Sequence, residues 1–216
     1  MKKYNDIIIG GVVIAIIAIG MVLVIGFGAK GANQIGSLIG TVSDQDWVEG
    51  NPNGRVTFVE YSDFQCPACA AYYPLVKRLV QDLGSDIRFV YRYFPLRQIH
   101  ANANLASYAA EAAGKQGKFW EMHDKIFDSQ RIWAESKDAE TLFTNYAVSL
   151  GLDMYKFKAD LVSPEVAQRV ESDYESGIKS GVNYTPSFFL NGRKIQNPQS
   201  YDEFRAIVAQ ALASEL

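Results

Sequence analysis

The chain has 216 residues, of which 48% are hydrophobic and 21% charged, proportions that fit a globular protein and exclude a disordered or fibrous one. Its 21 lysines and arginines against 24 aspartates and glutamates give a net charge of -3. Because nucleic-acid binding calls for a basic patch or stripe, we expect no nucleic-acid partner.

The N-terminal part contains a long apolar segment, residues 7–27, without a single charge. A helix of that length spans roughly 31 Å, close to the thickness of a bilayer, so we predict one transmembrane signal-anchor helix at 7–27 after a cytoplasmic N-terminus at 1–6. A signal peptide cleaved near the small residues that follow is the alternative. Lys2 and Lys3 before the span, against Lys30 after it, favour a single-pass protein of the cell membrane with its folded part outside the cytoplasm.

Residues 28–50 are rich in glycine, serine, asparagine and glutamine, which is typical of a linker, and the folded domain is expected at 51–216. The β-branched and aromatic residues 56–61 predict a strand. A helix should begin at the cysteines and end at Gly84, and a second strand should cover residues 86–94.

A helical insert is expected at 96–180, since this region carries several amphipathic patterns and no strand pattern. A short hairpin should follow at 187–195, turning at Asn191 and Gly192, and a last helix should begin with the capping box of Ser200 and Glu203. A helix that links two strands favours parallel pairing. The order of elements therefore predicts an α/β fold with one antiparallel edge and a helical subdomain.

Both cysteines of the chain stand two residues apart in the segment FQCPAC, as Cys66 and Cys69. A zinc site needs four ligands, and the chain's two histidines, His100 and His123, are 23 positions apart, which is not zinc-ligand spacing. A structural disulfide is a second reading, although so short a loop constrains the unfolded chain very little. The third reading is a redox-active pair.

The position of Cys66 at a helix start favours the redox reading. Unpaired backbone N–H groups and the positive end of the helix dipole stabilise a thiolate there, and the thiolate is the reactive form of cysteine. Cys69, one turn further on, would attack a mixed disulfide at Cys66 and release the bound partner.

With these motifs the chain resembles the thioredoxin superfamily, and specifically the DsbA-like, membrane-anchored thiol-disulfide oxidoreductases. The resemblance covers about residues 45 to 215. It rests on FQCPAC, on Tyr184-Thr-Pro-Ser-Phe-Phe-Leu-Asn-Gly192, which is similar to the family's cis-proline loop and hairpin, and on Gly117-Lys-Phe-Trp-Glu-Met-His-Asp124 in the insert. It implies a thioredoxin-like fold with a helical insert.

The resemblance also implies roles for further residues. Pro186 would be the cis-proline and Thr185 the residue facing the cysteines, and Thr185 with Pro67 and Ala68 would bind substrate. Glu60 would be a buried proton acceptor for Cys69; alternatively it faces water on an edge strand. We expect neither a metal nor another cofactor.

The expected activity is thiol-disulfide exchange that introduces disulfides into exported proteins. Ala68 stands where strong oxidants of this family commonly have histidine, so a reductase or isomerase is the alternative, as is an assembly factor regulated by its disulfide. The resemblance implies exported substrates with free thiols or disulfides, and a membrane partner, either a quinone-linked oxidase or an electron-delivering reductase. With no room for a dimerisation domain, we expect a monomer.

Overall fold

The computed structural model describes residues 36–214, so the predicted N-terminus at 1–6 and transmembrane helix at 7–27 lie outside the described residues. Within 36–214, no helix is both long and apolar enough to cross a bilayer.

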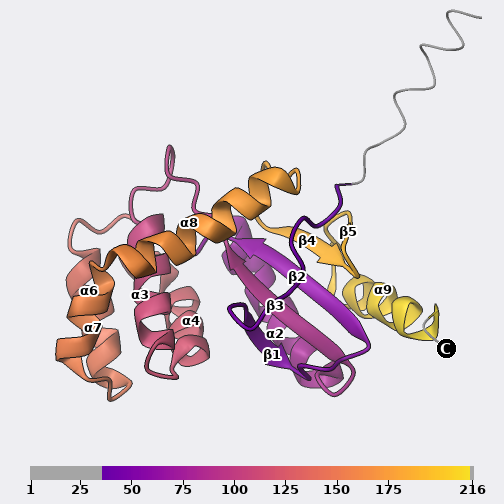
Figure 1. The fold of residues 1–216 in the computed structure, drawn as a ribbon, viewed down its shortest axis with the longest axis horizontal. Helices are drawn as coiled ribbons and strands as arrows, with labels where there is room; N and C mark the ends of the chain where they lie inside the picture. Colours follow the sequence, from indigo (N-terminus) through magenta and orange to yellow (C-terminus); the bar gives the residue numbers. More distant parts are fainter. Residues whose placement is uncertain (1–35, 215–216) are drawn as a thin grey trace, which may run out of the picture. The chain divides into compact units, whose positions relative to one another are not determined.

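The centre of the fold is a mixed sheet with the strand order β1-β3-β2-β4-β5 (Figure 1). β2 and β3 are parallel and are joined through helix α2, as the sequence predicted, and every other neighbouring pair is antiparallel. The strands are β1 (Trp47–Gly50), β2 (Val56–Ser62), β3 (Ile87–Tyr93), β4 (Ser187–Leu190) and β5 (Arg193–Lys194). In the turn between β4 and β5, Asn191 and Gly192 have φ angles of 45° and 79°, positive values that these two residue types tolerate best.

The helices fall into two groups. Those between β3 and β4 form the helical insert predicted from the sequence, and α2 and α9 belong to the sheet layers (Figure 1). The helices are α2 (Pro67–Leu83), α3 (Ala103–Gly114), α4 (Phe119–Asp128), α5 (Gln130–Trp133), α6 (Ala139–Ser149), α7 (Met154–Leu161), α8 (Pro164–Lys179) and α9 (Tyr201–Ser214).

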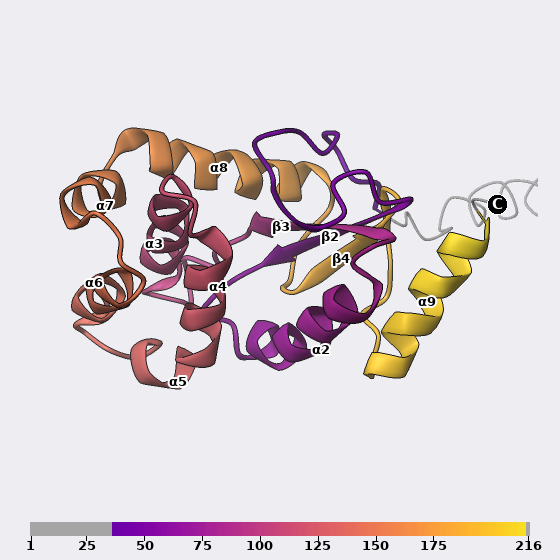
Figure 2. The same ribbon diagram turned by 90° about the horizontal axis from the view of Figure 1, so that it is seen from below.

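The two faces of the sheet are covered by different helices: α2 and α9 lie on one face and α8 crosses the other (Figure 2). Successive side chains of a strand point to opposite faces. On β2, Phe58 packs against Phe204 of α9, while the Tyr61 hydroxyl lies 2.8 Å from the Ser176 hydroxyl of α8. Glu60 shares the face of Phe58, so its carboxyl points towards the layer that carries the cysteines.

The domain begins earlier than the sequence indicated. Residues 47–50, expected in the linker, form β1 and pair antiparallel with β3, so both edges of the sheet are antiparallel rather than one. Further upstream, the Leu38 amide donates to the Gly192 carbonyl at 2.8 Å and the Ile39 amide to the Ser180 hydroxyl at 2.8 Å. The expected boundary at 51 was wrong because a four-residue edge strand takes its conformation from its partner strand, not from a pattern of its own.

A buried ion pair fastens this upstream segment to the sheet. The guanidinium of Arg92 on β3 donates to both carboxylate oxygens of Asp46, at 2.7 and 3.1 Å, and to the Tyr61 hydroxyl at 2.9 Å. The side chains of Arg92 and Asp46 are only 5% and 4% exposed. Removing one partner of such a pair leaves an uncompensated buried charge.

We therefore expect Asp46→Ala to lower the free energy of unfolding of the full chain by about 3 kcal/mol or more. Asp44→Ala is the matched control, since Asp44 is exposed and its loss should change stability by less than about 0.5 kcal/mol. Urea unfolding of both variants measures the difference. Equal effects at the two positions would contradict the anchoring role of the ion pair.

Candidate active site

The two cysteines occupy the first turn of α2 but differ in access. Cys66 is the N-cap residue and Pro67 the first helical residue, where its missing N–H costs no hydrogen bond. Both sulfurs are free thiols; Cys66 is 7% exposed and Cys69 is fully buried. Of the two cysteines, only Cys66 therefore presents any surface to an incoming sulfur, whereas Cys69 presents none.

The surroundings of Cys66 favour its thiolate. They lower the pKa of Cys66 from 9.0 to about 5, first through the hydrogen bond from the Cys69 thiol and then through the Thr185 side chain and the backbone N–H groups of Cys69 and Ala68. Burial acts in the opposite direction and is outweighed. Ala68 thus contributes its backbone N–H at the helix N-terminus, although its side chain contributes no charge.

The Cys69 thiol is held in its protonated form. Burial raises its pKa well above 9.0, and the charges of Cys66 and Glu60 add to the effect. The Asp63 backbone N–H, 3.5 Å from the Cys69 sulfur, opposes it weakly. The two sulfurs of one helical turn therefore have opposite preferences, one for the thiolate and one for the thiol.

The loop before β4 closes the site on the side of Cys66. The peptide bond between Thr185 and Pro186 is cis, which confirms the conformation expected for Pro186. The Cys66 sulfur lies 3.6 Å from the Thr185 carbonyl oxygen. The Thr185 hydroxyl is buried and has no other hydrogen-bond partner among the described residues, so it remains available to the thiolate.

Glu60 lies on β2, between β3 and β4, and is 3% exposed. The alternative that Glu60 faces water on an edge strand is therefore wrong. Burial raises its pKa from 4.5 to about 7; the Ser62 hydroxyl lowers it and the charge of Cys66 raises it further. A carboxyl that titrates near neutral pH is suited to exchanging protons with a thiol.

Polar residues that the sequence did not single out fix the loop between β2 and α2. One oxygen of the Asp63 carboxylate accepts from the backbone N–H of Gln65 at 2.8 Å, and the other lies 2.6 Å from His100 Nδ1. From the helical insert, the Gln130 side chain donates to the carbonyls of Phe64 and Cys66, at 2.7 and 3.0 Å. The insert thus holds the cysteine loop in place.

The FQCPAC segment gave a hint of this bracing, since Gln65 and its neighbour Asp63 are polar residues directly after a buried strand. Their distant partners could not be read from the sequence, because they lie 33 to 69 positions further along the chain. His100, considered from the sequence only as a zinc ligand, contacts Asp63.

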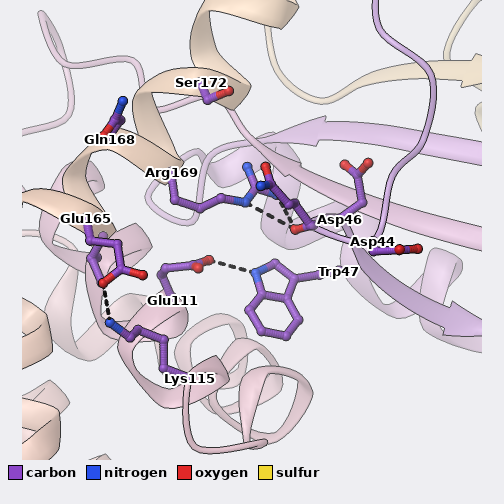
Figure 3. Close-up of a pocket in the computed structure, with 11 residues that line it drawn as sticks. Asp44, Asp46, Trp47, Glu111, Lys115, Glu165, Gln168, Arg169 and Ser172 are labelled. Atoms are coloured by element: carbon purple, nitrogen blue, oxygen red, sulfur yellow. Dashed lines mark hydrogen bonds and ion pairs between the residues drawn. The ribbon is translucent and has the colours of Figure 1, made fainter.

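A second cleft, of about 530 Å³, lies away from this site, between α3, α8 and the segment before β1 (Figure 3). Several of its charged groups already have partners within the protein. Glu111 accepts from the Trp47 indole at 2.7 Å, Lys115 pairs with Glu165 at 2.9 Å, and Arg169 pairs with Asp173 at 2.5 Å. No group of three metal-ligating side chains occurs in residues 36–214.

A family model described as thioredoxin matches residues 42–210. The chain belongs to this family. The start of the match also agrees with a domain that begins before residue 51.

Several solved structures share this fold, two of them at or above 25% identity. A thioredoxin-like oxidoreductase from Silicibacter pomeroyi is 30% identical, with a TM-score of 0.66 and coverage of 78% of this chain and 93% of that one. BdbD from Bacillus subtilis, in its oxidised form, is 25% identical, with a TM-score of 0.71 and coverage of 82% and 99%. The α-DsbA1 protein of Wolbachia pipientis, at 19% identity and a TM-score of 0.70, shares the fold. The chain thus belongs to the thioredoxin family and shares the fold of α-DsbA1.

Curated relatives with higher identity are named as transport proteins. The Na⁺/H⁺ antiporter NhaA 3 of Salinispora tropica is 40% identical over 171 residues, which are 79% of this chain and 25% of the antiporter. The NhaA antiporter of Herminiimonas arsenicoxydans is 39% identical over 169 residues, again 25% of its length. The thioredoxin-family chain spans about a quarter of the length of these relatives, so their names describe much larger proteins.

The raised pKa of Glu60 predicts a pH-dependent stability difference in the reduced protein. Between about pH 4.5 and 7 the folded state holds a proton that the unfolded state has lost, so stability falls as pH rises. Glu60→Gln removes the free-energy cost of ionising this buried carboxyl. We therefore expect the variant to be more stable than the wild type by about 3 kcal/mol at pH 8 and equally stable near pH 4. Urea unfolding under reducing conditions measures both values. A difference that does not change with pH would contradict the burial of an ionisable Glu60.

Proposed function

We propose that this protein introduces disulfides into exported proteins by exchange at Cys66 and Cys69. The observation that carries the proposal is the unequal pair of sulfurs: Cys66 retains a small exposed surface and favours the thiolate, while Cys69 is fully buried and protonated. Such a pair suits dithiol exchange, in which one sulfur forms a mixed disulfide with the substrate and the other sulfur resolves it.

The exchange conserves atoms and electrons. A substrate thiolate attacks Cys66 in the disulfide form, the Cys66–Cys69 bond breaks, and Cys69 leaves as a thiolate that takes a proton. A second substrate thiolate then attacks the mixed disulfide at the substrate sulfur, so the substrate gains a disulfide and Cys66 leaves as a thiolate. Two electrons have moved from the substrate to the protein.

The ease with which Cys66 leaves as a thiolate supports the oxidising direction. Its pKa of about 5 lies between about 7 for thioredoxin and about 3.5 for DsbA. A low thiolate pKa stabilises the reduced form and so makes the disulfide form a stronger oxidant. The backbone N–H groups of Ala68 and Cys69 and the Thr185 side chain supply this stabilisation without a histidine between the cysteines.

The remaining residues take supporting roles in the proposal. Thr185, beside the cis-proline Pro186, would align an extended substrate segment as an added strand. Pro67 and Ala68 would form the surface next to Cys66, and Glu60 would exchange the proton of Cys69. We further propose a monomer, anchored in the cell membrane by residues 7–27, whose extracytoplasmic domain is reoxidised by a quinone-linked membrane partner.

Turnover of a reduced, unfolded protein tests the activity. The full chain, with oxidised glutathione as the terminal oxidant, should accelerate disulfide formation, and Cys66→Ala should reduce the rate to the uncatalysed one. Cys69→Ala should instead accumulate mixed disulfides at Cys66, because the buried resolving sulfur is absent.

The same variants separate an enzyme from a docking factor. If Cys66→Ala turned over at the wild-type rate, or if the wild type did not exceed the uncatalysed rate, the proposed function would be wrong. Retained partner binding together with absent turnover in the wild type would instead indicate a factor regulated by its disulfide.

A further inference from the structure

A small chamber lies behind Glu60, and neither cysteine is among the residues that line it. Its volume is about 10 Å³, room for about one water molecule. Glu60 lines its inner end, and Lys77, Asp124 and Glu49, all partly exposed, line it towards the surface. The other lining residues are Tyr73, Val76, Phe89, His123 and Phe127.

The proposed reaction requires such a connection to solvent. Each time Cys69 takes or gives a proton through Glu60, Glu60 must recover its own charge state, yet it is only 3% exposed. Its neighbour across the sheet, Tyr91, cannot supply the proton, because burial raises the pKa of its hydroxyl well above 10. A titratable group on the wall of the chamber can exchange this proton with Glu60.

His123 is that group. It is 6% exposed and lies on α4, where its ring packs edge-on against Tyr91, at 4.8 Å between ring centroids, and Phe127, at 5.0 Å. Its Nδ1 lies 3.0 Å from one carboxylate oxygen of Asp124, and the other oxygen accepts from Lys77 at 2.6 Å. Asp124 and Lys77 are 34% and 41% exposed, so this chain of contacts ends in solvent.

The groups around the imidazole keep it neutral at rest but able to take a proton. Burial lowers its pKa, and the hydrogen bond and charge of Asp124 partly restore it. A neutral ring that donates from Nδ1 to Asp124 leaves Nε2 free to accept. The titratable groups that face this region come from every element packed around it: Glu49 of β1, Glu60 of β2, Tyr91 of β3, Tyr73 and Lys77 of α2, and Asp124 and Asp128 of α4.

We propose that His123, with one water molecule in the chamber, relays protons between Glu60 and the surface pair of Asp124 and Lys77. The inference rests on the proposed function and assigns a residue that acts through Glu60, not on the sulfurs.

Protons and bonds are accounted for in both half-cycles of the relay. When the Cys69 thiol attacks a mixed disulfide, its proton passes to Glu60, the Cys66–Cys69 bond forms, and the partner sulfur leaves as a thiolate. Glu60 then passes its proton through the water to His123 Nε2, and the Nδ1 proton leaves towards Asp124 and solvent. When Cys69 is next released as a thiolate, the same steps run in reverse and restore the original tautomer of His123.

The test is the rate of the intramolecular step. The reduced full chain is mixed with oxidised glutathione, the reaction is quenched with acid, and the conversion of the mixed disulfide at Cys66 into the internal disulfide is followed by mass spectrometry. We expect His123→Phe, which keeps an aromatic ring but carries no proton, to slow this step about 10-fold and to enlarge its solvent deuterium isotope effect. His123→Gln, a polar residue that does not titrate, should behave in the same way if the phenylalanine variant fails to fold.

Phe127→Leu is the matched packing control, because Phe127 lines the same chamber and contacts His123. It should lower thermal stability without changing the isotope effect. Wild-type kinetics in both His123 variants, or a slowing with the same unchanged isotope effect as Phe127→Leu, would overturn the relay. Either result would leave turnover by Cys66 intact, whereas failure of the proposed function would abolish turnover in the wild type itself.

Discussion

The site depends on one constraint, that Cys66 is the N-cap residue of α2. The N–H groups of the first helical turn have no partners within the helix, so they point at whatever occupies the cap. Because a proline follows, the free donors that meet the sulfur belong to Ala68 and Cys69, and the positive end of the helix dipole lies behind them. A sulfur that carries negative charge satisfies these groups better than a thiol does.

The same turn of helix gives Cys69 the opposite character. Three residues further along, its sulfur points into the core, beneath the cap and above the sheet. Charge is costly there, both because Cys69 is buried and because Cys66 and Glu60 are close. Glu60 itself is driven towards its neutral form by the same burial. One negative charge is favoured in this group of three residues, and the proposed exchange moves a proton between the two buried members, Cys69 and Glu60.

The sequence predicted those parts of the fold that depend on local pattern. The strand before FQCPAC, the hairpin at Asn191 and Gly192, and the long helical insert all follow from patterns within a few residues, and each is present. β1 was missed because its conformation depends on β3, about 40 positions away. The Arg92 to Asp46 pair and the Gln130 brace were missed for the same reason, since nothing near each residue identifies its partner.

The roles of the two histidines show a further limit of the sequence. Their spacing argued against a zinc site, but spacing says nothing of a residue that acts alone. His100 meets Asp63 and His123 meets the chamber behind Glu60 only because the insert packs against the sheet. Contacts between residues that are far apart in the sequence can be seen in the structure but cannot be read from the sequence.

The central claim is that stabilisation of the Cys66 thiolate makes this pair an oxidant, although its intervening residues are proline and alanine. The measurement that tests it most directly is the reduction potential of Cys66 and Cys69 in the full chain, equilibrated against glutathione. The account predicts a value between about -180 and -120 mV, whereas a value near about -270 mV would mark a reductant and contradict it.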